Sequence, residues 1–87
     1  MKSYAVIITY PYEPFSPEKS AVYLFETENE AKRFLEDSIK EQFQINVGKD
    51  DYEVDYWMNK ERTYGWYKEW NLEDISMMEV SISRVYE

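Results

Sequence analysis

Carboxylates and aromatic rings, the side chains in this chain best suited to recognition or catalysis, are concentrated between residues 50 and 70. This stretch, DDYEVDYWMNKERTYGWYKEW, holds seven aromatic residues and six carboxylates in twenty-one positions. Carboxylates can ligate a cation or move protons, and exposed rings can anchor a partner. The stretch is therefore either a binding site or the outer part of a small sheet.

A metal or catalytic role is not favoured by the spacing of these residues. Asp51, Glu53 and Asp55 alternate as at the start of a calcium loop, which also needs Gly at its sixth position and Glu at its twelfth. Those two positions are Tyr56 and Arg62. The chain has no Cys and no His, which excludes thiolate nucleophiles, imidazole catalysis and the usual zinc sites. We expect no metal, no cofactor and no enzymatic activity.

The length and net charge of the chain limit the number of domains and the kinds of partner that can be expected. Eighty-seven residues predict a single α+β domain spanning 1–87, and eighteen acids against ten bases give a net charge of −8. Nucleic acid and anionic membranes require clustered Lys and Arg, so direct contact with either is not expected. No export signal and no apolar run of about 20 residues is visible, which predicts a cytoplasmic protein.

The first half of the chain predicts two strands and a helix. Residues 3–10, SYAVIITY, are apolar at nearly every position, which is typical of a strand covered on both faces. A proline-rich loop follows at 11–20, and residues 21–25 predict a second strand. Thr27 and Glu30 fit a capping box, so we expect a helix from Glu28 to Phe43 or slightly beyond, with Gly48 as its stop.

The second half predicts three strands. Polar and apolar residues alternate over 52–58, over much of 64–70 and over 78–83, and residues 59–62 are suited to a hairpin turn. A helix over 50–60 is the alternative for the first of these. The order β-β-α-β-β-β predicts an α+β fold of two layers, with one amphipathic helix packed on a mostly antiparallel sheet.

One helix covers only one face of such a sheet, so apolar and aromatic side chains are expected on the other. An exposed patch of this kind usually marks an interface, and homodimerisation through the sheet is one way to cover it. If the chain turns back after Gly48, acids of the helix and of the next strand share one region, with aromatic anchors nearby. The candidate partner-binding residues are Glu36, Asp37, Glu41, Asp50, Asp51, Glu53, Asp55, Tyr56, Trp57, Trp66 and Trp70.

Carboxylates at this density can mimic a phosphate track and occupy a basic protein surface. We expect a non-enzymatic protein-binding module, of the kind that phages and mobile elements use as accessory or inhibitory proteins against nucleic-acid-handling partners. The alternatives are a small-ligand or carbohydrate binder that uses Trp66 and Trp70, and a homodimer of unknown role.

Overall fold

The computed structural model describes residues 2–11, 20–49 and 51–85, and that part of the chain forms one helix and five strands. The elements are β1 (Tyr4–Thr9), β2 (Ser20–Phe25), α1 (Glu28–Asn46), β3 (Glu53–Met58), β4 (Tyr64–Trp70) and β5 (Ile75–Arg84). The predicted order and the α+β class are confirmed. The alternative helix over 50–60 is wrong, because residues 53–58 are a strand. Most of the predicted proline-rich loop, residues 12–19, lies outside the described residues.

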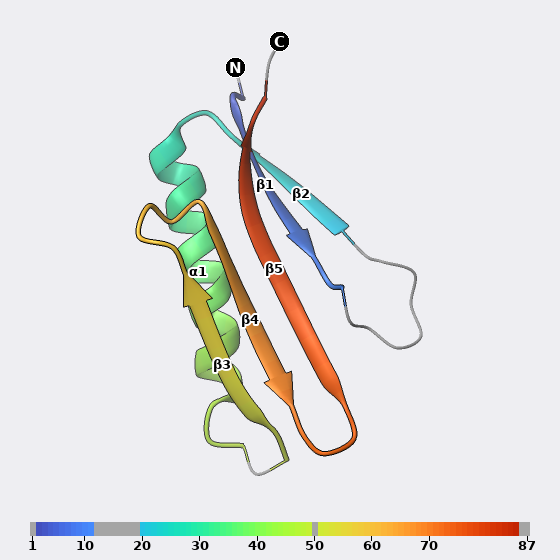
Figure 1. Ribbon diagram of the computed structural model, residues 1–87. Coiled ribbons are helices and arrows are strands. Elements are labelled where there is room, and N and C mark those ends of the chain that lie inside the picture. The colour runs from blue at the N-terminus through green and yellow to red at the C-terminus, as the bar shows by residue number, and fades with distance from the viewer. Residues whose placement is uncertain (1, 12–19, 50, 86–87) are drawn as a thin grey trace.

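The sheet is antiparallel throughout, in the order β2-β1-β5-β4-β3 (Figure 1). The ten-residue β5 is its central strand and separates the β1–β2 pair from the β3–β4 hairpin. α1 packs against one face of the sheet (Figure 1). In β1, Val6 and Ile8 face α1, and Ala5 and Ile7, which point to the other side, are buried and half-buried although no described helix or strand lies over them.

Helix α1 begins where the sequence predicts. Thr27 is the N-cap, and its Oγ1 accepts a hydrogen bond of 3.2 Å from the backbone N–H of Glu30. The helix runs to Asn46, slightly beyond the predicted end at Phe43. Gly48 follows with a φ of 85°, a conformation that favours glycine, so its role as the stop is confirmed.

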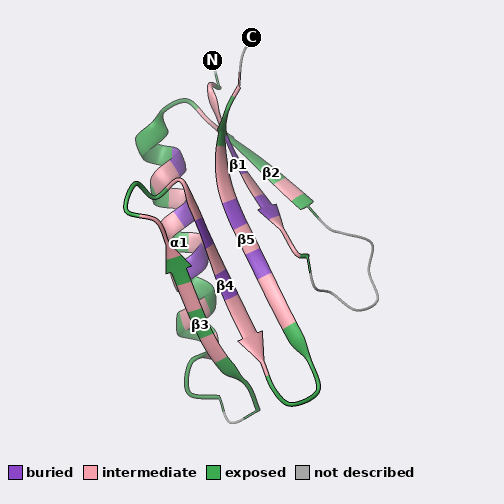
Figure 2. Ribbon diagram, in the orientation of Figure 1, coloured by how far each residue is buried: buried purple, intermediate pink, exposed green. Residues whose placement is uncertain are grey.

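The core lies between α1 and the inner face of the sheet (Figure 2). Leu35 and Ile39 are fully buried, and each contributes roughly 1.5–3 kcal/mol relative to an exposed position. The buried residues of this cluster are Val6, Ile8, Ala31, Leu35, Ile39, Tyr67, Met78 and Val80. Because every second residue of a strand points to the same face, this set fixes which side chains point away from α1.

The helix is attached differently to the two ends of the sheet. Next to β4, a methyl group on Gly65 would lie 2.5 Å from Ile39 Cδ1 and 2.7 Å from the carbonyl oxygen of Trp57, so only glycine fits. At β2, rings make the contact: the Phe34 centroid lies 4.8 Å from that of Tyr23 and 5.1 Å from that of Phe25. The close approach to the β4 backbone is thus found at the β3–β4 end, and the contact of α1 with β2 is aromatic packing.

Candidate functional site

The face of the sheet that points away from α1, which we call the open face, is the main candidate surface. No described helix or strand lies on it. It carries the alternate residues of each strand, because their neighbours point into the core. These residues are Ser20, Val22, Leu24, Ala5, Ile7, Thr9, Ile75, Met77, Glu79, Ser81, Ser83, Tyr64, Trp66, Lys68, Trp70, Glu53, Asp55 and Trp57.

All three tryptophans of the chain lie on the open face. Trp57 of β3 stands directly opposite Trp66 of β4, and Trp57 is 48% exposed. The Tyr64 ring lies 6.2 Å from the Trp57 ring. Lys68 Nζ lies 5.1 Å from the centroid of Trp70, within the range of a cation–π contact. The β3–β4 end of the face is therefore an aromatic surface on which one ring, that of Trp70, already contacts the ammonium group of Lys68.

Three carboxylates lie among these rings, and the strand register places each of them. Glu53 is opposite Trp70, Asp55 is opposite Lys68, and Glu79 of β5 is opposite Trp66. Burial and then the nearby Glu79 carboxylate raise the pKa of Tyr64 above its ordinary value. We call Tyr64, Trp57, Trp66, Trp70, Glu53, Asp55 and Glu79 the acidic aromatic half.

The ion pairs found among the described residues all involve helix carboxylates. Glu28 pairs with Lys32 at 2.9 Å, and Glu36 pairs with both Lys40 at 2.7 Å and Arg62 at 2.9 Å. Hydrogen bonds from Lys40 and then Arg62 lower the pKa of Glu36. The carboxylates of the acidic aromatic half have no such partner in the described part of the chain, so their charge is available to a ligand.

The structure does not bring the predicted acidic residues into one region. Asp37 and Glu41 are exposed on α1 and Glu36 pairs with cations beside it, whereas Glu53 and Asp55 lie on the opposite side of the sheet.

Two further candidates lie away from the open face, and one is outside the described residues. Tyr56 points toward α1, with its ring centroid 4.8 Å from that of Phe43, so it belongs to the packing of the helix. Asp51 is exposed in the connection before β3. Asp50 lies outside the described residues. No group of three or more acidic side chains between 51 and 85, or elsewhere in the described chain, is placed to hold a metal ion.

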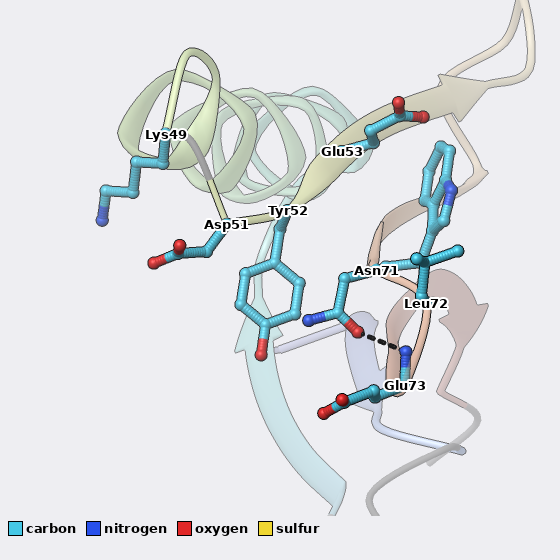
Figure 3. A pocket seen from close by; sticks show the side chains of 8 residues that line it. Lys49, Asp51, Tyr52, Glu53, Asn71, Leu72 and Glu73 are labelled. Carbon is cyan, nitrogen blue, oxygen red and sulfur yellow. Dashed lines mark hydrogen bonds between the residues drawn. The ribbon is translucent and has the colours of Figure 1, made fainter.

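A shallow hollow of about 790 Å³ adjoins the acidic aromatic half at the start of β3 (Figure 3). Its lining residues are Lys49, Asp51, Tyr52, Glu53, Trp70, Asn71, Leu72 and Glu73. Asn71 Oδ1 accepts hydrogen bonds from the backbone N–H groups of Glu73 and Asp74 at 2.8 and 2.7 Å, which shapes the turn between β4 and β5. The hollow extends the aromatic surface around Trp70.

The hollow includes Trp70 but not Trp66. The two tryptophans lie four positions apart along β4, a distance of about 13 Å in an extended strand. They are therefore too far apart to stack together on one sugar ring.

A second hollow, of about 440 Å³, lies on the helix side between α1 and the ends of β1, β4 and β5. In this hollow the hydroxyl of the buried Tyr67 donates a hydrogen bond of 2.7 Å to Glu69 Oε2. Burial and then Glu69 raise the pKa of Tyr67, so the phenol stays protonated. Because the Tyr67 hydroxyl keeps its proton and donates a hydrogen bond to Glu69, this contact contributes to packing, and the hydroxyl is not activated as a nucleophile.

Comparison with known proteins adds no functional assignment. No protein-family description, no curated protein and no solved structure matches the chain. In the described ranges, α1 is not long and apolar enough to cross a membrane.

Sequence reasoning did not select Tyr64 and Glu79, which complete the acidic aromatic half. The signal for Glu79 was present, because it alternates with the apolar residues Met78 and Val80 and so lies on the other face of its strand.

Proposed function

We propose that this chain is a non-enzymatic protein-binding module whose acidic aromatic half docks on a basic protein surface. The observation that carries the proposal is the placement of three carboxylates among all three tryptophans, on a sheet face that no described helix or strand covers. None of the three makes an ion pair within the described part of the chain. Aromatic side chains supply most of the binding energy at protein interfaces, and complementary charge selects the partner.

The partner's contribution follows from the chemistry of this surface. Arg and Lys side chains can pair with Glu53, Asp55 and Glu79 while their stems and charges lie over the tryptophan rings, as Lys68 already lies over Trp70. Proteins that handle nucleic acid present such basic surfaces. An accessory or inhibitory protein of a phage or mobile element that covers one of them is the role these features support.

The proposal is tested with two triple variants of equal net charge and an arginine-rich peptide as the probe. The open-face variant is Glu53→Gln, Asp55→Asn and Glu79→Gln. The helix variant, which serves as the matched control, is Glu30→Gln, Asp37→Asn and Glu41→Gln. Binding is followed by intrinsic tryptophan fluorescence, because the three tryptophans all lie on the open face.

We expect the open-face variant to bind roughly tenfold more weakly than the wild type, since three surface charge contacts of a few tenths of a kcal/mol or more are lost. The helix variant should bind as the wild type does. Added salt should abolish the difference by screening. Equal weakening of both variants would show that the peptide responds only to net charge, and the proposal would then be rejected.

A further inference from the structure

The β2 edge of the sheet is exposed, apolar and uncharged. The strand reads SAVYLF, and Val22, Tyr23 and Leu24 are 58%, 44% and 50% exposed. No described strand lies beyond it, because β2 is the outermost member of the sheet (Figure 1). An edge strand without charges is a template for pairing with another chain.

The hydrogen-bond pattern of the sheet shows which backbone groups of β2 face outward. The N–H of Ile82 donates to the carbonyl of Thr63 at 2.9 Å, so the even-numbered residues of β5 bond to β4 and its odd-numbered residues bond to the odd-numbered residues of β1. The even-numbered residues of β1 therefore bond to β2. The even-numbered residues of β1 are opposite odd-numbered residues of β2. Antiparallel alternation therefore directs the N–H and C=O groups of Ser20, Val22 and Leu24 to the outer side.

The β3 edge is different, because it carries charge and blocks one of its own donors. Glu53 and Asp55 are exposed on this strand. The same alternation directs the N–H of Tyr56 outward, and Asp55 Oδ1 accepts a hydrogen bond from it at 2.8 Å. Charged residues and occupied donors are the features by which natural sheets prevent edge pairing.

We infer that β2 pairs antiparallel with β2 of a second copy of this chain, across a two-fold axis perpendicular to the sheet. The strand is self-complementary in this arrangement: Val22 lies opposite Val22 or Leu24 of the second copy, and these apolar side chains share the open face beside Ile7. A chain of net charge −8 repels its own copies, so an uncharged edge is where two copies approach at the lowest electrostatic cost. The acidic aromatic half, at the far end of the sheet, stays free.

The first test compares matched proline variants at the two edges by sedimentation equilibrium, from micromolar to millimolar concentration. Val22→Pro removes an outward N–H and leaves the β1–β2 hydrogen bonds in place. Two intermolecular hydrogen bonds are lost per dimer, so the dissociation constant should rise roughly tenfold to a hundredfold. Val54→Pro removes the corresponding outward N–H at the β3 edge and should leave the constant unchanged. Circular dichroism checks that both variants are folded.

Leu24→Lys provides a second variant in case Val22→Pro does not fold, because it adds only an exposed charge to the β2 edge. It should also produce monomers. Wild-type chain that stays monomeric throughout the concentration range, or a dimer that resists both β2 variants, would overturn the inference. High salt should preserve this dimer, whereas it should weaken the binding of a basic partner, so the two proposals fail separately.

Cysteine cross-linking then tests the geometry, since the chain has no cysteine of its own. Under mild oxidation, Val22→Cys or Tyr23→Cys should form a disulfide with the same residue of the second copy, because residues on the two-fold axis have Cβ atoms about 4.5–5.5 Å apart. Whichever of the two reacts identifies the register. Trp57→Cys at the β3 edge should not react. Cross-linking at Trp57→Cys alone would overturn the inference.

Discussion

The two ends of the open face come from one sheet, yet they present opposite chemistry. At the β2–β1 end the strands carry the exposed Val22 and Leu24 and the half-buried Ile7 and contain no charged residue, whereas the β4–β3 end places carboxylates among tryptophans. On the helix side both ends make ring contacts, Phe34 with Tyr23 at β2 and Phe43 with Tyr56 at β3, and only the β4–β3 end adds the close backbone approach at Gly65. We propose that these two ends are separate recognition surfaces, which should respond to salt in different ways.

The largest expected effect is a loss of stability when the close contact between Gly65 and Ile39, beneath the acidic aromatic half, is disturbed. Gly65→Ala should lower the free energy of unfolding by about 1–3 kcal/mol, because the new methyl group meets the Trp57 carbonyl and Ile39. Urea denaturation measures it. Ile39→Val, which removes Cδ1, normally costs about 0.5–1.5 kcal/mol. In the Gly65→Ala background it should cost less, and strict additivity of the two changes would contradict the steric account.

A smaller loss of stability is expected when the ring that attaches α1 to either end of the sheet is removed. Phe34→Leu removes the ring that contacts Tyr23 and Phe25, and Phe43→Leu removes the ring that contacts Tyr56. Each should cost about 1 kcal/mol of stability, since aromatic pairs contribute roughly 0.5–1.5 kcal/mol beyond their buried area. In hydrogen exchange, the first variant should deprotect β2 and the second β3. Identical patterns would mean that the ends are not independently attached.

The smallest effect concerns the titration of Tyr64. Its pKa is raised above the ordinary value of 10.0 by burial and by Glu79, so its protonated form is favoured in the folded state. The resulting stability is fully present below pH 10 and is lost as the pH rises through the higher folded pKa. Glu79→Gln should lower the Tyr64 pKa while burial keeps it above the ordinary value, and the ring-carbon chemical shift of Tyr64 follows this by NMR. An unchanged midpoint in Glu79→Gln would contradict the proximity of the two groups.

Most of the fold was predictable because its signals are local. Apolar runs located β1 and β2, the period-two pattern located β3, β4 and most of β5, and the Thr27 cap located the start of α1. The predictions were less accurate where tertiary pairing extends an element. β5 begins at Ile75 and not near Met78, because Ile75 pairs with Trp70 of β4 and lengthens the ladder.

The site was less predictable because it depends on which face α1 covers. The alternation already separated Tyr56 from Trp57, but it did not show which of the two would be buried. It also did not show that Glu53 and Asp55 would lie across the sheet from Asp37 and Glu41. The register that sets Trp57 opposite Trp66 follows from the β3–β4 turn, where Asn59 Oδ1 accepts hydrogen bonds from the N–H groups of Thr63 and Tyr64.

The hydrogen bond between Asp55 and the N–H of Tyr56 also bears on how large an assembly can become. A sheet that is adhesive at both edges adds subunits indefinitely and grows into a filament. Here the Asp55 carboxylate occupies the outward N–H of Tyr56 at the β3 edge. Pairing through β2 therefore leaves no second edge, among the described strands, that can add a further copy. Replacing Asp55 with a residue that cannot accept this hydrogen bond would free the second edge, and the closed pair would become a chain with a growing end.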